Sequence, residues 1–178
     1  MLRKALIVAA LLAILVAVGG IAVARGTPSL STEGPTSVSG TEASAVFTLG
    51  DHTIRQVRYD DDGTLRYTFK IANDGRLPVR IVGLAEDQPE ARLFTVTEIT
   101  DGTVSPGDSE EFTVSVHMAG CETLSSRAGS FVSQVSVRTE TAGMFEDSVE
   151  LELPEEVHTG SPREAFCPNS TATSRPPG

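Results

Sequence analysis

The chain contains few of the residues on which enzyme catalysis most often depends. Only three histidines and two cysteines occur among its 178 residues. Nucleophilic catalysis requires a nucleophile, a base and a group that orients the base, and neither a Gly-x-Ser-x-Gly elbow nor a Ser-x-x-Lys motif is present. We therefore expect no enzyme, and we assign no catalytic or cofactor-binding residue.

Basic residues are also scarce, and lysine in particular occurs only at positions 4 and 70. Without Arg3, Lys4 and Arg25, eleven of the 14 basic residues remain against 24 acidic ones, so residues 26–178 carry a net charge of about −13. A surface of this sign repels nucleic acids and anionic lipid headgroups. The composition thus argues against nucleic-acid binding, and nothing in it indicates a small-molecule substrate.

A single long apolar run lies at the start of the chain. Residues 5–24 contain no charged side chain, and at about 1.5 Å per residue roughly 20 such residues span the hydrocarbon core of a bilayer. Two basic residues precede the run and one follows it, which predicts a cytoplasmic N-terminus and an extracytoplasmic C-terminal part. We expect residues 1–25 to be a signal anchor in the cell membrane.

Cleavage of this segment is the alternative, and it would yield a secreted protein. Ala22-Val23-Ala24 has the small-x-small pattern of a signal peptidase site, but the apolar run exceeds the roughly 7 to 15 residues typical of a signal peptide. No cysteine lies near the end of the run, which argues against a lipoprotein anchor. In both cases the remainder of the chain lies outside the cytoplasm.

The composition divides the rest of the chain into three parts. Residues 26–42 are rich in Ser, Thr, Gly and Pro and are expected to form a flexible linker. Residues 43–158 are expected to form one domain, and residues 159–178 a Pro/Ser/Thr-rich tail. In an oxidising compartment, Cys121 and Cys167 are expected to form one disulfide that tethers this tail. The bridge would close a loop of about 46 residues and contribute about 4 kcal/mol.

Alternating patterns in the central part predict β-strands and little helix. Apolar residues occupy every second position in 64–72, 111–118 and 149–153, and Phe131, Val135 and Val137 share a face in the same way. Gly, Pro, Asn and Asp clusters separate these runs, as at Asn73-Asp74-Gly75 and Pro106-Gly107-Asp108. The pattern is typical of an all-β sandwich of about seven to eight antiparallel strands.

Two of these segments carry a family resemblance. Residues 67–75, Tyr-Thr-Phe-Lys-Ile-Ala-Asn-Asp-Gly, precede a Pro and the β-branched segment 78–84, and Phe94-Thr95-Val96 and then Pro106-Gly107 follow in order. This arrangement resembles hydin-like immunoglobulin-like domains, the group that includes relatives of the major sperm protein. It is also similar to short single-pass envelope proteins of actinobacteria. The resemblance covers about residues 60–153 and implies an immunoglobulin-like β-sandwich.

Metal handling is the alternative function from a different class. His117, Met118, Cys121 and Met144 are soft ligands that could attract copper in an extracytoplasmic protein, as a carrier or an assembly chaperone would require. His117 and Met118 are neighbours on a predicted strand, so they should point to opposite faces. We therefore assign no metal-binding residue.

The candidate interaction surface is acidic. Glu150, Glu152, Glu155 and Glu156 follow one another near the last predicted strand and could meet a basic partner. A second candidate is the loop between Cys121 and Gly129, because a sandwich can vary its loops without losing its core. The sequence therefore predicts a non-catalytic, membrane-anchored interaction or structural module whose partner is an envelope or membrane protein.

Overall fold

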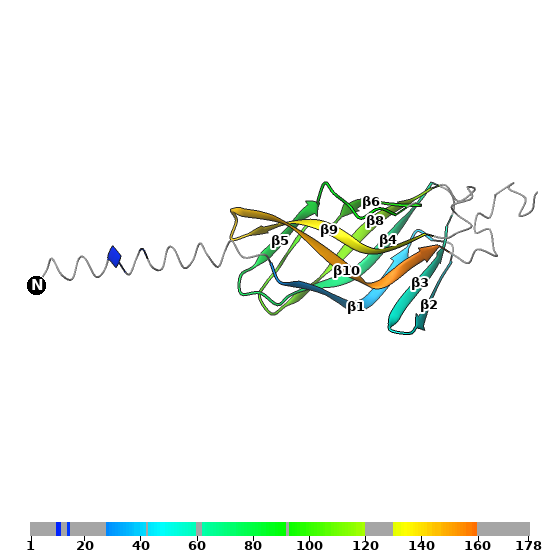
Figure 1. Cartoon of the computed structure of the whole chain (residues 1–178), viewed down its shortest axis with the longest axis horizontal. Coiled ribbons are helices and arrows are strands. Elements are labelled where there is room, and N and C mark those ends of the chain that lie inside the picture. Colours follow the sequence, from blue (N-terminus) through cyan, green and yellow to red (C-terminus); the bar gives the residue numbers. More distant parts are fainter. Residues whose placement is uncertain are drawn as a thin grey trace, which may run out of the picture.

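The computed structural model describes residues 10–11, 14, 28–41, 43–59, 62–91, 93–119 and 130–159. Ten strands form two sheets (Figure 1). The four-stranded sheet has the order β1 (Leu30–Ser39), β4 (Gly63–Asn73), β8 (Ser109–Met118), β6 (Phe94–Ile99). The six-stranded sheet has the order β2 (Ala43–Leu49), β3 (His52–Arg58), β10 (Phe145–Thr159), β9 (Phe131–Thr141), β5 (Val79–Leu84), β7 (Gly102–Val104).

One hydrophobic core lies between the two sheets. The inward positions of β4 and β8 are almost fully buried, which confirms the alternation predicted for both segments: Leu65, Tyr67, Phe69, Ile71, Phe112, Val114, Val116 and Met118. Val149 and Leu151 of β10 face them from the six-stranded sheet, and Leu153 is partly buried against the same core. The predicted all-β, two-layer architecture is therefore confirmed.

The number and direction of the strands differ from the prediction. Ten strands are present among the described residues instead of seven or eight. One pairing is parallel, because β10 runs alongside β3 with Glu156 opposite Ile54 and Thr159 opposite Val57. The prediction of an entirely antiparallel sandwich is therefore wrong at this position.

The predicted linker over residues 26–42 is wrong for residues 30–39. This segment is strand β1, which pairs antiparallel with β4 from Leu30 opposite Asn73 to Ser39 opposite Arg66. Its Leu30, Thr32, Thr36 and Val38 are half-buried, while the intervening side chains are mostly exposed. Ser and Thr are accepted here because alternate positions of an edge strand face water. The domain thus begins at about residue 30 and not at residue 43.

The inward pattern of β9 is also only partly as predicted. Val135 and Val137 are fully buried, but Phe131 is 55% exposed and Val132 takes the core position instead. The pairing of β9 with β10 shifts between Glu152 and Val157, where β10 advances five residues and β9 advances two. Because of this irregularity, Val132 and not Phe131 faces the core at the start of β9.

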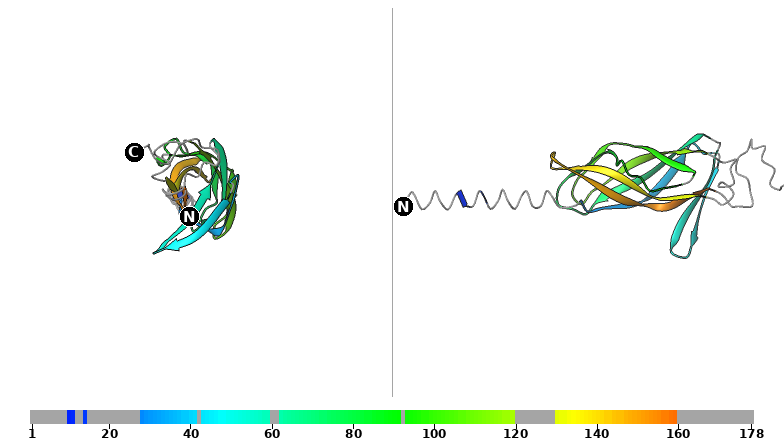
Figure 2. Two further views of the ribbon diagram at one scale, coloured as in Figure 1. Left: turned by 90° about the vertical axis from the view of Figure 1, so that its right-hand side faces the viewer. Right: turned by 45° about the horizontal axis from the view of Figure 1, so that its top comes forward.

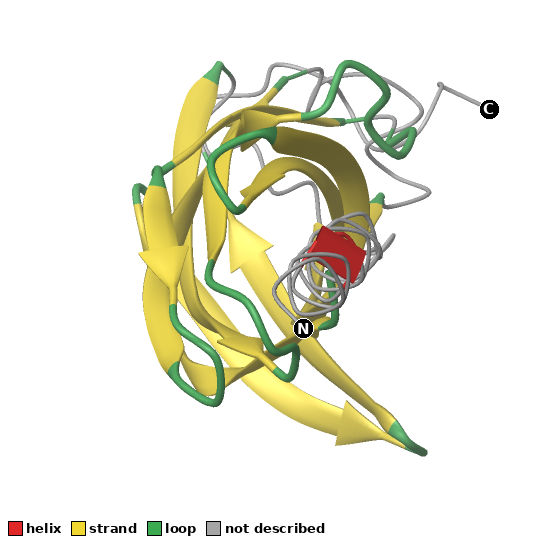
Figure 3. Cartoon of the chain, turned by 90° about the vertical axis from the view of Figure 1, so that its left-hand side faces the viewer, coloured by secondary structure: helices red, strands yellow, loops and turns green. Residues whose placement is uncertain are grey.

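The β2–β3 hairpin projects from the body of the domain. Its tip stands clear of the other strands in three different views (Figures 1, 2 and 3). Residues 44–49 of β2 are all exposed, whereas Ile54, Arg55 and Val57 of β3 are buried. The base of the hairpin is thus part of the domain, while its outer strand forms an edge.

Several predicted features lie outside the described residues. They are the tail from residue 160 onward, the loop of residues 120–129, and with them Cys121 and Cys167. Of the predicted membrane span only residues 10, 11 and 14 are described, and all three are helical. Within the described part of the chain, no helix has the length and apolar character needed to cross a bilayer.

We predict that Gly40→Ala destabilises the domain far more than Gly50→Ala. Both glycines have positive φ, 78° and 66°, which alone costs about 1–2 kcal/mol for alanine. A Cβ on Gly40 would lie 2.1 Å from the carbonyl oxygen of Thr64, whereas one on Gly50 would meet nothing within 4 Å. Chemical denaturation should therefore show a loss of about 3–5 kcal/mol at position 40 only. Equal losses at both positions would contradict the close approach of Gly40 to β4.

Candidate interaction surface

The four glutamates of the predicted acidic surface do not share one face. Along β10, Glu150 and Glu152 are exposed and Glu156 is partly exposed, but Glu155 is only 8% exposed. Inward positions of this strand are the odd-numbered ones from Val149 to Thr159, so Glu155 belongs to the inner face. The predicted surface therefore has three members, and the fourth has a different environment.

Glu155 forms an ion pair with Arg55 of β3. The Arg55 Nε lies 2.5 Å from Glu155 Oε2, and its second guanidinium nitrogen lies 3.1 Å from Oε1. The two side chains are 9% and 11% exposed, so the pair is largely removed from water. In this bidentate geometry, two hydrogen bonds between the guanidinium and the carboxylate best offset the free-energy cost of removing both charges from water.

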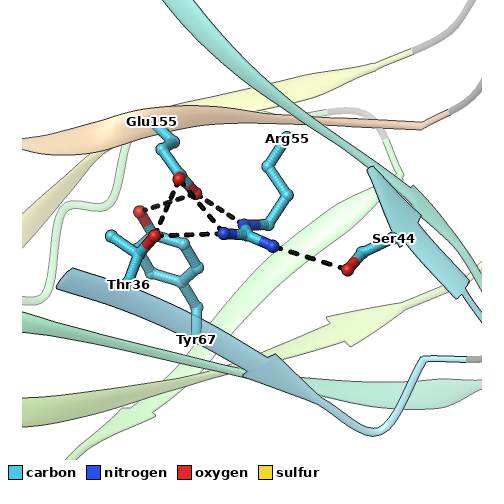
Figure 4. A network of polar contacts seen from close by, with 5 residues as sticks. All are labelled: Thr36, Ser44, Arg55, Tyr67 and Glu155. Carbon is cyan, nitrogen blue, oxygen red and sulfur yellow. Dashed lines mark hydrogen bonds and ion pairs between the residues drawn. The ribbon is translucent and has the colours of Figure 1, made fainter. Parts of the chain in front are cut away.

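Three further side chains complete this network (Figure 4). The Thr36 hydroxyl donates to Glu155 Oε1 at 2.7 Å and accepts from the Arg55 guanidinium at 3.0 Å. The Tyr67 hydroxyl lies 3.5 Å from Glu155 Oε2, and Arg55 also donates to Ser44 Oγ at 3.4 Å. The five residues come from β1, β2, β3, β4 and β10, so the network connects the two sheets at the base of the hairpin.

The electrostatics of the network keep Tyr67 protonated. Burial raises the pKa of the Tyr67 hydroxyl, the negative charge of Glu155 raises it further, and Arg55 only partly offsets these effects. A protonated hydroxyl can donate to the carboxylate, as the geometry shows. Because these side chains bond to one another and the ion pair at their centre is largely buried, we interpret the network as structural.

A second cluster lies on the outer face of the six-stranded sheet. Glu156 Oε1 is 2.5 Å from His52 Nδ1, and Glu156 Oε2 is 2.8 Å from His158 Nε2. The His158 ring stacks on Phe131 at 5.1 Å between centroids with 18° between planes. The hydrogen bond from His158 lowers the pKa of Glu156, His52 lowers it further, and burial opposes both. This cluster connects β3, β9 and β10 and also explains the position of Phe131.

The three potential copper ligands that the structure describes are not brought together. Met118 is fully buried, His117 on the opposite face of β8 lies 3.6 Å from Asp62, and Met144 in the β9–β10 turn is 74% exposed. The prediction that His117 and Met118 point to opposite faces is confirmed. Within the described part of the chain, no three His, Cys, Asp or Glu residues are arranged to hold a metal ion. Cys121 lies outside that part.

The outer edge of β2 is a further candidate surface, which the sequence alone did not reveal. Val46, Phe47 and Leu49 are 47%, 45% and 65% exposed, and no charged residue occurs between residues 43 and 49. Phe47 lies opposite Ile54 and shares the outer face with it. The combination of β-branched and aromatic residues without a charge was the available signal, but the sequence does not show which predicted strand lies at the edge of a sheet.

Neither the family models nor the curated proteins contain a match to this chain.

We predict that Glu155→Ala lowers the free energy of unfolding by about 3–5 kcal/mol, because it leaves the Arg55 charge buried without its partner. The double variant Arg55→Met/Glu155→Leu should recover most of this loss, since it removes both charges. Glu152→Ala, an exposed change on the same strand, is the control and should stay within about 0.5 kcal/mol of the parent. Chemical denaturation measures all three. A Glu155→Ala cost no larger than that of Glu152→Ala would contradict the buried ion pair.

We predict that Glu156→Gln is destabilising at neutral pH by about 0.5 kcal/mol, the scale of partly exposed ion pairs. The folded protein lowers the pKa of Glu156 below its ordinary value of 4.5, so this stabilisation is present above pH 4.5 and is lost as the pH falls through the lowered value. Denaturation at several pH values from 7 to 3 should show the two proteins converge at the acidic end. Glu150→Gln is the matched control. A difference that persists undiminished at the acidic end would contradict the assignment.

Proposed function

We propose that the chain is a non-catalytic, membrane-anchored extracytoplasmic protein whose single immunoglobulin-like domain binds another protein of the cell envelope. The observation that carries this proposal is the uncharged, exposed edge of β2 on a hairpin that the Arg55–Glu155 ion pair attaches to β10. Large exposed apolar side chains at a regular sheet edge are typical of protein-binding sites that extend a β-sheet.

The strand order supports the immunoglobulin-like assignment. The order β1-β4-β8-β6 corresponds to the A-B-E-D sheet of a constant-type immunoglobulin fold, and β10-β9-β5 corresponds to G-F-C. In the six-stranded sheet, the β2–β3 hairpin then adds two strands beside β10, the G strand, and β7 adds one strand beside β5, the C strand. The resemblance of residues 67–84 to hydin-like domains agrees with this assignment, because these residues form most of β4 and all of β5, the B and C strands.

The apolar N-terminal run supports anchoring. Leu11 and Ile14 are helical, and their apolar side chains are about 60% exposed. A lipid environment would cover them. Because β1 begins at residue 30, only five residues separate the end of the predicted span from the domain. Five extended residues reach at most about 17 Å, so the domain would lie close to the bilayer.

The test is the state of the full chain in a bacterial host that exports it. We expect it in the membrane fraction, accessible to protease added outside the cytoplasmic membrane. Its intact mass should include residues 1–24 and be two hydrogens below the reduced value, as the Cys121–Cys167 disulfide requires. A variant without residues 1–24, which should stay in the cytoplasm, is the control. A chain recovered from the medium that begins near residue 25 would contradict anchoring.

A further inference from the structure

In the part of the chain that the structure describes, four strands form the edges of the two sheets, and three of them are protected against further pairing. β7 has only three residues, β6 has a register shift between Val96 and Glu98, and β1 has one between Glu33 and Ser37, around Gly34-Pro35. Short strands, bulges, charges and prolines are the features by which proteins prevent edge-to-edge association. Three edges are therefore unsuited to binding another strand.

The fourth edge, β2, has none of these features. Its seven residues pair with β3 in an unbroken register, and they include no proline, glycine or charged residue. Among the described residues, no strand pairs with its outer side. The Arg55–Glu155 network and the Glu156 histidine cluster both attach β3, the neighbour of this edge, to β10. The exposed edge is thus a regular template that is attached to the domain.

We infer that the occupant of this edge is the β2 strand of a second copy of the chain, paired antiparallel about a two-fold axis at Val46. In that register Phe47 lies opposite Ala45 of the partner copy and Thr48 lies opposite Ser44, so each larger side chain meets a smaller one. Val46 lies opposite itself. No like charges oppose one another along the pair, which is the condition that self-pairing of an acidic protein must satisfy.

A second copy of the chain is thus the partner that the proposed function requires. The contribution of the membrane to this pairing rests on the proposed anchoring. Pairing two seven-residue strands buries less than the roughly 1,200–2,000 Å² of a stable interface, so the isolated dimer should be weak. Anchoring both copies in one bilayer would raise their effective concentration and favour the dimer. Figure 1 shows the hairpin projecting from the side of the domain, where a neighbouring copy can reach it.

The first test is disulfide trapping of the full chain in its membrane with Val46→Cys. Directly opposed residues of an antiparallel pair have Cα atoms about 4.5–5.5 Å apart, within the range of about 4.4–6.8 Å for a disulfide. We expect mild oxidation to give a covalent dimer. Thr95→Cys, exposed on the β6 edge, is the matched control, and the parent chain gives the background of the two natural cysteines. Equal dimer from both variants, or a Val46→Cys adduct only with a different protein, would overturn the inference.

The second test is sedimentation of the detergent-solubilised full chain over a range of concentrations. Val46→Lys places two positive charges opposite each other and should weaken dimerisation at least tenfold, whereas the isosteric Val46→Thr should retain it. Unchanged melting temperatures would confirm that both variants fold. Dimerisation of Val46→Lys equal to that of the parent, or a parent that stays monomeric throughout, would overturn the inference. Sedimentation does not require an anchor, so it still reports self-pairing if the chain proves to be secreted.

Discussion

The buried ion pair between Arg55 and Glu155 is the interaction on which the arrangement of the other surfaces depends. It lies where β1, β2, β3, β4 and β10 meet, and Thr36 and Tyr67 contribute hydroxyls to the same carboxylate. A buried pair of this kind adds little net stability relative to an apolar replacement, but breaking it is costly. It therefore constrains geometry: any displacement of β3 that leaves Glu155 inside the domain would leave its carboxylate buried without the Arg55 guanidinium.

Much of the fold of the domain can be predicted from the alternation of apolar and polar residues. The inward sets of β4 and β8 were predicted because strict alternation places every second residue on one face, and tertiary packing agrees with it. β1 was missed because composition was given more weight than periodicity: Leu30, Thr32, Thr36 and Val38 do alternate, but Ser, Gly and Pro surround them. Phe131 could not be placed because its face depends on a local shift in pairing with β10, which requires the partner strand to be known.

The candidate site was predicted less well, for a related reason. Glu155 was grouped with Glu150, Glu152 and Glu156, although the alternation of β10 continued through it would have placed it inside. Its partner, Arg55, is 100 residues away in sequence, and the pairing depends on a parallel contact between β3 and β10. The exposed edge of β2 was equally inaccessible, since an uncharged β-branched run is typical of a core strand until its neighbours are known.

The most direct test of this account is hydrogen exchange of the parent chain and the Glu155→Gln variant, resolved along the sequence. The account predicts faster exchange in residues 30–58, which include β1 and the hairpin, while the centres of β4, β8 and β9 retain their protection. This result would show that the ion pair attaches the hairpin edge to an independently stable core. Equal acceleration in every strand, or no change in β1 and β3, would contradict that claim.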